Sequence, residues 1–364
     1  AELAEALPDE EDLALAIEAY GVEPGGNFRE EATGRRTGAN VLLGARDAAA
    51  LAERRGAAPA GIERRLRGIR ERLLAARRER VRPARDDKVL ADWNGLAIAA
   101  LARAGRALEA PRFVEAAARA AEFLARELVD EAGRPLHRWR DGDAAVPAMA
   151  DDLAFVAWGL VELYESTYEP RWLERAAATL DELLERYEAP GGGFYQTADD
   201  VDATLVRILE SSDGALPSAN SVATLTLLRL ARLTGESRFE AAAHRALAAL
   251  GGRVTASPAG HAALLQAAQF AAGPTAEVVI GGPAGDEATR RLLAPLRRGF
   301  HPRAVTLLKP TDDPAVADRL AALAPFTAAL RPEGGAPTAW LCRDHACELP
   351  RTDPGALVAA LEEV

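Results

Sequence analysis

Residues 92–105, DWNGLAIAALARAG, place a polar cluster directly before an apolar helix. Asp92 is a good N-cap because its carboxylate accepts a backbone N–H, so we expect the helix to begin at Trp93. Gly105 stands where a helix-ending residue of positive φ belongs. Trp93 and Asn94 would then lie at the positive end of the helix dipole, where a cleft would favour anions and other polar groups.

The same pattern returns twice downstream. Expected helix starts at Asp92, Asp151 and Ser218 are each followed twenty positions later by an arginine and an aromatic residue (92 to 112, 151 to 171, 218 to 238). Each unit is an apolar helix, a short turn and a more charged helix, which is an αα-hairpin. We expect the first, more apolar helix of each hairpin to be the inner one. The pairs are Arg112-Phe113, Arg171-Trp172 and Arg238-Phe239.

Hairpins arrayed in this way close into an (α/α) toroid, so the predicted fold class is mainly α. A fourth inner helix is expected over 261–272. The loops at 133–140 and 191–195 return the chain to the rim where the inner helices begin. We therefore predict that residues 1–273 form the barrel portion, with lead-in helices in 1–91 and the hairpin repeats in 92–273.

Outside the repeats, the sequence pattern predicts shorter elements at both ends of the chain. The lead-in region contains one acidic helix over 10–20 and two helices in 46–80 that are split near Pro59. After Pro274 the spacing of apolar residues changes, and the pattern indicates strands that alternate with helices. We expect strands at 276–280, 304–308 and 336–342 and helices at 286–297 and 314–324, which make residues 274–364 a small α/β tail packed on the barrel.

Composition excludes several classes of function. A formal net charge of −11 argues against nucleic acid, which requires a clustered basic surface. No apolar run reaches the roughly 20 residues that span a bilayer, and residues 1–5 do not resemble a signal peptide, so we expect a cytoplasmic protein without membrane partners.

The five histidines lack the spacing of metal ligands, so neither a metal nor another cofactor is expected. Cys342 and Cys347 have four residues between them instead of the two of a redox motif, and we expect a buried or edge pair without a catalytic role.

The rim of the expected toroid would gather carboxylates with aromatic and amide groups, the side chains that sugar chemistry uses. The alternative is that Asp92, Asp151 and Ser218 are only helix caps. Our candidate acid–base pair is Asp152 and Asp213, with Asp151 as a third catalytic carboxylate. The candidate substrate-binding residues are Trp93 as a stacking platform, Asn94, Asn220 and Ser221 as hydroxyl-binding groups, and Tyr195 and His137 on the returning loops.

Several motifs together resemble the thioredoxin-domain-containing YyaL family, called spermatogenesis-associated protein 20 in animals. The resemblance implies a six-hairpin glycosidase-like barrel whose fold is similar to glycoside hydrolases and N-acylglucosamine epimerases. Family members carry a thioredoxin-like domain before the barrel, and this chain is expected to begin after the family's first two hairpins. The matching segments are RDDKVL (85–90), WNGL (93–96), DDLAF (151–155), GGFY (192–195), DGALPSANS (213–221) and AWLCRDHACELP (339–350).

The resemblance and the rim residues leave three functions open. The first is a carbohydrate-active protein with glycoside hydrolase-like acid–base chemistry on a small-molecule or oligosaccharide substrate. The second is a non-catalytic scaffold that binds carbohydrate or protein, and the third is an epimerase-like enzyme. Because four inner helices would leave the toroid an open arc, we expect apolar faces at its N-terminal edge that missing hairpins would cover. The expected partners are a missing N-terminal thioredoxin-like domain or a second copy of the chain, which would associate through the open edge.

Overall fold

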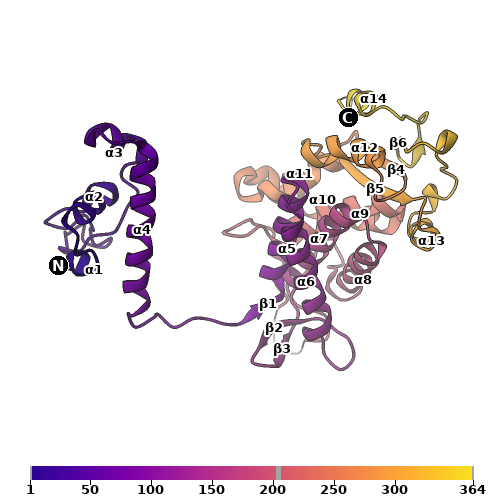
Figure 1. The fold of residues 1–364 in the computed structure, drawn as a ribbon. Helices are drawn as coiled ribbons and strands as arrows, with labels where there is room; N and C mark the ends of the chain where they lie inside the picture. Colours follow the sequence, from indigo (N-terminus) through magenta and orange to yellow (C-terminus); the bar gives the residue numbers. More distant parts are fainter. Residues whose placement is uncertain (1, 202–205, 363–364) are drawn as a thin grey trace. The chain divides into compact units, whose positions relative to one another are not determined.

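The computed structural model describes residues 2–201 and 206–362. Its chain divides into two compact units, Ala1–Asp86 and Asp87–Val364 (Figure 1). The first unit contains the helices α1 (Glu2–Ala6), α2 (Glu10–Tyr20), α3 (Ala48–Arg55) and α4 (Pro59–Arg78). These helices share a core of their own around Leu15, Leu51 and Ile69. The predicted acidic helix and the helix break at Pro59 are both confirmed.

The second unit contains the expected array of helical hairpins (Figure 1). The inner helices pack side by side in chain order, and each of the first three is followed by its outer partner. The fold is therefore mainly helical and of the (α/α) toroid type, with three hairpins and a fourth inner helix in residues 87–201 and 206–362. The hairpins are α5 (Ala91–Ala107) with α6 (Pro111–Glu127), α7 (Ala150–Thr167) with α8 (Pro170–Tyr187), and α9 (Ala219–Thr234) with α10 (Ser237–Ala256), and the fourth inner helix is α11 (Ala262–Ala271).

The arginine–aromatic pairs of the repeat make the same contact in all three hairpins. Each arginine stands near the start of an outer helix and lays its guanidinium over the ring of the next residue, a cation–π contact. The distances from the guanidinium carbon to the ring centroid are 4.6 Å for Arg112 and Phe113, 4.1 Å for Arg171 and Trp172, and 4.0 Å for Arg238 and Phe239. The sequence repeat is therefore a structural repeat.

Two of the three predicted helix starts are wrong, both in the residue at which the helix begins and in the capping role given to the aspartate. Helix α5 begins at Ala91 and α7 at Ala150, so Asp92 and Asp151 lie inside the first turn and are not N-caps. The reason is that the carboxylate of Asp152, the third residue of α7, accepts the backbone N–H of Met149 in its own helix start and that of Asp92 in the first turn of α5. Ser218 is the N-cap of α9 as predicted, its side chain accepting from the N–H of Ser221.

Glycines decide how closely the first two inner helices approach each other. A Cβ atom on Gly95 would lie 2.5 Å from the backbone carbon of Phe155 in α7, and one on Gly159 would lie 2.8 Å from the carbonyl oxygen of Gly95. Gly105, expected to end its helix with a positive φ, instead lies within α5, which runs to Ala107. A Cβ atom on Gly105 would lie 2.5 Å from Cγ2 of Val114, so its small size serves the packing of α5 on α6.

We expect Gly95→Ala to lower the free energy of unfolding of the second unit by about 1–3 kcal/mol, because the added methyl group must push two helix backbones apart. All five tryptophans lie after residue 86, so tryptophan fluorescence in a urea titration follows this unit alone. The control is Gly252→Ala in α10, where the added Cβ meets open space and should stabilise the helix by up to about 1 kcal/mol. Equal midpoints for the two variants would contradict the close packing.

The strands form two small sheets. A three-stranded antiparallel sheet joins β1 (Val89–Leu90), β2 (Leu136–Arg140) and β3 (Asp143–Pro147) at the start of α5. A four-stranded sheet has the order β5-β4-β6-β7 and carries the tail helices. Its elements are β4 (Ala276–Gly282), α12 (Glu287–Arg298), β5 (Ala304–Pro310), α13 (Pro314–Leu323), β6 (Thr338–Arg343), β7 (Ala346–Cys347) and α14 (Pro354–Leu361).

The α/β tail exists as predicted, but it shares one hydrophobic core with the hairpins. Buried residues of β4 and β5 such as Val279 and Leu307 belong to the same cluster as Leu163 of α7 and Leu230 of α9. The chain therefore divides into compact units between Asp86 and Asp87, whereas the sequence pattern places the boundary of the α/β tail between residues 273 and 274. None of the described helices combines the length and the apolar composition needed to cross a bilayer.

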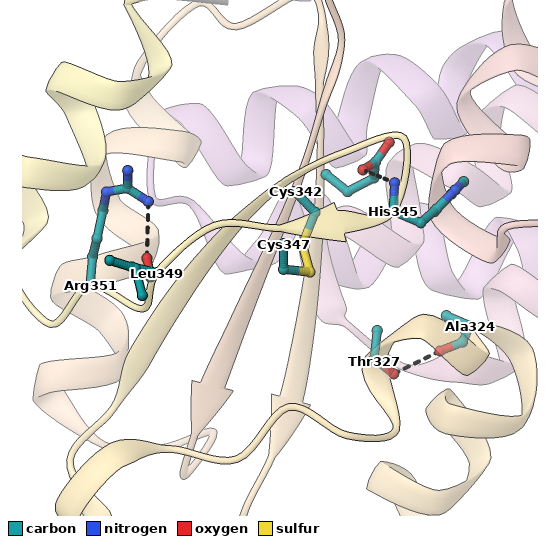
Figure 2. Close-up of a disulfide and its surroundings, with 8 residues drawn as sticks. Ala324, Thr327, Cys342, His345, Cys347, Leu349 and Arg351 are labelled. Atoms are coloured by element: carbon teal, nitrogen blue, oxygen red, sulfur yellow. Dashed lines mark hydrogen bonds between the residues drawn. A yellow bond between two sulfur atoms is a disulfide. The ribbon is translucent and has the colours of Figure 1, made fainter.

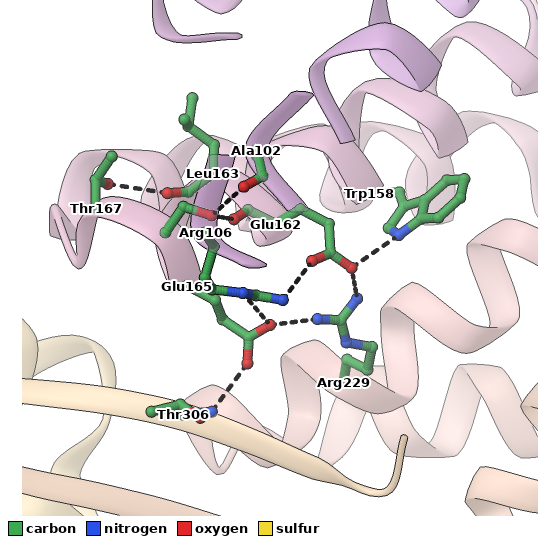
Figure 3. Close-up of polar contacts among 10 residues, drawn as sticks. Ala102, Arg106, Trp158, Glu162, Leu163, Glu165, Thr167, Arg229 and Thr306 are labelled. Carbon is green, nitrogen blue, oxygen red and sulfur yellow. Dashed lines mark hydrogen bonds and ion pairs between the residues drawn. The ribbon is translucent and has the colours of Figure 1, made fainter. Parts of the chain in front are cut away.

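A buried ion cluster joins the last turns of three inner helices (Figure 3). Arg229 of α9 donates to Glu162 at 2.6 Å and to Glu165 at 2.5 Å, both on α7. Arg106 of α5 lies 3.3 Å from Glu162 and 3.5 Å from Glu165. The backbone N–H of Thr306 in β5 donates to Glu165 at 2.9 Å, so the cluster also holds the tail sheet in place.

Candidate active site

Four acid–base side chains meet at the rim where α5 and α7 begin. Asp92 lies in the first turn of α5, Asp151 and Asp152 lie in the first turn of α7, and His137 projects from β2. Asp92, His137 and Asp152 each offer a ligand-type atom within 4.8 Å of the others. The antiparallel pairing of β1 with β2 brings His137 to this point, since it sets Leu90, at the start of α5, opposite Arg138.

Asp152 is the hub of the cluster, and its hydrogen-bonding capacity is filled. It is 2% exposed. One oxygen accepts the N–H of Asp92 at 2.9 Å, the other accepts the N–H of Met149 at 2.8 Å, and both lie within 3.0 Å of Nδ1 of His137. A carboxylate so buried and so committed positions its neighbours and is not free to attack a substrate.

The pairing with Asp152 leaves His137 ready to exchange a proton. The hydrogen bond at Nδ1 raises the pKa of His137, an effect that burial opposes. Its side chain is 23% exposed, and Nε2 makes no hydrogen bond to any residue that the structure describes. An imidazole held by a carboxylate at one nitrogen and open at the other is the arrangement of a general base.

Asp92 and Asp151 are half-buried carboxylates with raised pKa values. Burial is the main cause for both, and the neighbouring carboxylate of Asp152 adds to it. Asp92 accepts the N–H of Trp93 at 2.7 Å. Asp151 accepts a hydrogen bond from Gln196, and another from the backbone of Ala219 partly offsets the rise in its pKa. Both groups are therefore suited to donate a proton, since a raised pKa keeps a carboxyl protonated closer to neutral pH.

Asp213 does not belong to this cluster. Its carboxylate accepts the N–H of Ser218 at 3.0 Å, the hydroxyl of Ser221 at 3.0 Å and the N–H of Ala263 at 2.7 Å. It therefore joins the N-termini of α9 and α11. None of its hydrogen bonds reaches Asp152, its partner in the acid–base pair predicted from the sequence.

The remaining predicted residues divide into exposed and buried groups. Trp93 is 62% exposed beside Asp92, where a sugar ring can stack, and the half-buried Asn94 donates to the carbonyl of Leu90 at 2.8 Å. Asn220 and Ser221 are buried, and Asn220 bonds both backbone groups of Phe194. Tyr195 lies under the guanidinium of Arg207, whose central carbon is 4.3 Å from the ring centroid.

The sequence did not predict that Asp92 belongs to the cluster with His137 and Asp152, or that Gln196 donates a hydrogen bond to Asp151. Asp92 was interpreted as a cap, although the adjacent Trp93-Asn94 pair already marked this turn as polar. Gln196 follows Tyr195 in the returning loop, and the expected place of that loop at the rim was the available signal.

A metal at Nδ1 of His137 would compete with hydrogen bonds that the cluster already makes. Asp92, His137 and Asp152 are close enough to ligate a cation. However, a metal at Nδ1 of His137 would displace the hydrogen bond to Asp152, whose oxygens also serve two backbone N–H groups. Loss of those bonds would leave helix N–H groups without acceptors, which costs free energy.

A second polar region lies further along the inner helices. A pocket of about 200 Å³ is lined by Arg103, Trp158, Arg229, Gln266 and His301, among others. Trp158 follows Asp151 by seven residues, so both lie on one face of α7, roughly 10 Å apart along the helix at 1.5 Å per residue. The pocket therefore lies further along α7 than the rim, next to the ion cluster of Glu162, Glu165 and Arg229.

Comparison with known proteins agrees with the resemblance in the sequence. The chain is 30% identical over 355 residues to human spermatogenesis-associated protein 20, which covers 93% of this chain and 44% of that protein. It is 29% identical to the mouse protein over 96% of this chain and 45% of the other, and 27% identical to the uncharacterized protein B0495.5 of Caenorhabditis elegans over 77% and 38%. The chain thus spans less than half the length of these curated relatives. No protein-family model matches it.

Solved structures overlap the chain only in part. Cellobiose 2-epimerase from Spirochaeta thermophila is 20% identical with a TM-score of 0.38, covering 45% of this chain and 43% of that one. A family 105 glycoside hydrolase from C. acetobutylicum is 13% identical with a TM-score of 0.38, covering 68% and 73%. Superpositions this partial assign no activity. The sequence similarity to spermatogenesis-associated protein 20, by contrast, runs along nearly the whole of this chain.

Proposed function

We propose that the second unit is a carbohydrate-active enzyme that uses acid–base chemistry at the rim of its helical array. The observation that carries the proposal is the cluster of Asp92, Asp151 and His137 around the buried Asp152. Three proton-exchanging groups there are half-buried beside the exposed ring of Trp93. The polar pocket along the inner face offers further groups that could bind hydroxyls.

The hydrolase form of the proposal assigns the acid–base pair to Asp92 and Asp151. Both are more accessible than Asp152 and both have a raised pKa. One would protonate the leaving oxygen of a glycosidic bond, and the other would attack the sugar or activate water. The pair predicted from the sequence, Asp152 and Asp213, stays a prediction, and the hydrogen bonds filled at both carboxylates favour positioning roles for them.

An epimerase-like reaction is the second candidate, and the contact between His137 and Asp152 favours it. A histidine with a free Nε2 can remove a proton from a carbon next to a carbonyl, and a nearby acid such as Asp92 can return one. Inversion of the carbon requires the acid to return the proton on the face opposite the base, so the substrate would have to lie between the two groups. Their nearest ligand-type atoms lie within 4.8 Å of each other.

One experiment separates these reactions. The chain is incubated with a panel of disaccharides and reducing sugars in D₂O, and the products are followed by NMR and mass spectrometry. Cleavage without deuterium on carbon supports the hydrolase, whereas deuterium on the carbon beside the carbonyl supports the epimerase. Saturable sugar binding with neither product would contradict the enzyme and favour the carbohydrate-binding scaffold.

A further inference from the structure

Cys342 and Cys347 form a disulfide, which the sequence pattern did not indicate (Figure 2). The two residues face each other across β6 and β7, with Cα atoms 3.8 Å apart. The sulfurs differ in access, because Cys342 is completely buried whereas Cys347 is half-buried. A thiolate arriving from solvent therefore meets Cys347 first.

A buried carboxyl group lies across the next strand pair. Glu277 of β4 is directly opposite Cys342 in the antiparallel register, so both side chains project from the same face of the sheet. Glu277 is 0% exposed. Its Oε2 accepts the backbone N–H of His345 at 3.0 Å, whereas its Oε1 makes no hydrogen bond within the described part of the chain.

Charged groups from two elements lie near Glu277, but none of them forms a close ion pair with it alone. Arg232 of α9 lies 3.7 Å from Oε1, but it is also bonded to Glu240 and Asp344. Burial raises the pKa of Glu277, while the N–H and side chain of His345 and the charge of Arg232 oppose the rise and Asp344 adds to it. A carboxyl group that is buried, lacks a hydrogen-bond partner at one oxygen and belongs to the residue directly opposite Cys342 is placed to carry a proton.

We propose that this disulfide is a thiol–disulfide exchange site for an incoming dithiol, with Cys347 as the sulfur attacked and Glu277 as the proton donor to Cys342. In the first step the dithiol's thiolate bonds to Sγ of Cys347, the protein S–S bond breaks, and the leaving Cys342 thiolate takes the proton of Glu277. In the second step the other thiol of the dithiol, as its thiolate, attacks the mixed disulfide and releases Cys347 as a thiolate. The dithiol is oxidised, the protein gains two thiols, and Cys347 and Glu277 are protonated from solvent.

The test measures how fast dithiothreitol releases the two thiols of the folded full chain, using rapid alkylation and mass spectrometry without denaturant. We expect release under native conditions, and a rate at least about 10-fold lower for Glu277→Gln, because a buried thiolate without a proton donor is a poor leaving group. Asp344→Asn is the matched control. It removes a neighbouring charge that also contacts Arg232 but is 87% exposed, and it should leave the rate within about 2-fold.

Single-cysteine variants test which sulfur is attacked. We expect the free Cys347 of Cys342→Ser to form a mixed disulfide readily with a linear disulfide, oxidised glutathione, and the free Cys342 of Cys347→Ser to react much more slowly. Thiol release that requires denaturant would make the disulfide purely structural and overturn the proposal. Equal rates for Glu277→Gln and the original chain, with both folded by circular dichroism, would overturn the role of Glu277.

Discussion

Replacing Arg229 with methionine is expected to lower the free energy of unfolding of the second unit by about 3–5 kcal/mol, the usual cost of removing one partner of a buried ion pair. Glu162 and Glu165 are 2% and 4% exposed, and of their two ion-pair partners only Arg106 would remain, 3.3 Å from Glu162 and 3.5 Å from Glu165. Tryptophan fluorescence in urea measures the loss. Arg238→Met is the control, because its ion pairs are half-exposed and worth at most about 1 kcal/mol.

The loss should depend on pH in a defined direction. Burial alone would raise the pKa of Glu162, but Arg229, Arg106 and Arg103 hold it below its usual value. Stability from this group is therefore present above its unfolded-state pKa and lost as pH falls through its folded-state pKa. Without Arg229 the carboxyl can be protonated at a higher pH, so the difference between variant and original chain should shrink on acidification. A difference that grows on acidification would contradict this account of the cluster.

Replacing His137 with glutamine is expected to lower turnover of any sugar processed by the chain by at least about 10²-fold, the range for acid–base groups. Stability should change little, because the side chain is 23% exposed and bonds only Asp152. The control is His244→Gln on the exposed face of α10. Full activity in the His137 variant would remove the rim cluster from the mechanism.

The pH profile gives an independent check on the same histidine. Its hydrogen bond to Asp152 raises the pKa of His137, so the acidic limb of kcat/KM should lie above the usual histidine value of about 6.5. The bond stabilises the folded state at low pH, and this contribution is lost as pH rises through the raised pKa. Asp152→Asn should move the limb to lower pH. An unmoved limb would assign it to another group.

The sequence predicted the helical array well because its signals are local and repeated. Apolar periodicity and the arginine–aromatic pairs located every inner and outer helix, since each pair marks the start of an outer helix. Helix starts were less reliable. The preference of aspartate for the N-cap describes one helix alone, whereas here Asp152 reaches back to Met149 and across to Asp92 on another helix.

The site could be predicted only in part because its contacts are not local. Asp151, Asp152 and His137 were candidates from the sequence, but only strand register brings His137 onto Asp152. Asp213 has the same residue type and a similar position before a helix, yet its oxygens are occupied by Ser218, Ser221 and Ala263. Residue type and spacing cannot distinguish these two environments, because they differ in which neighbouring helix supplies the donors.

The hydrogen bonds along the rim have a consequence for how such arrays can change in evolution. Asp152 joins α7 to α5, Asp151 joins it to α9, and Asp213 joins α9 to α11. Each of these junctions consists of hydrogen bonds between adjacent inner helices and involves no hairpin further along. A duplicated hairpin would carry its own aspartate at the start of its inner helix. The array can therefore lengthen or shorten by whole hairpins while each remaining junction keeps its hydrogen bonds.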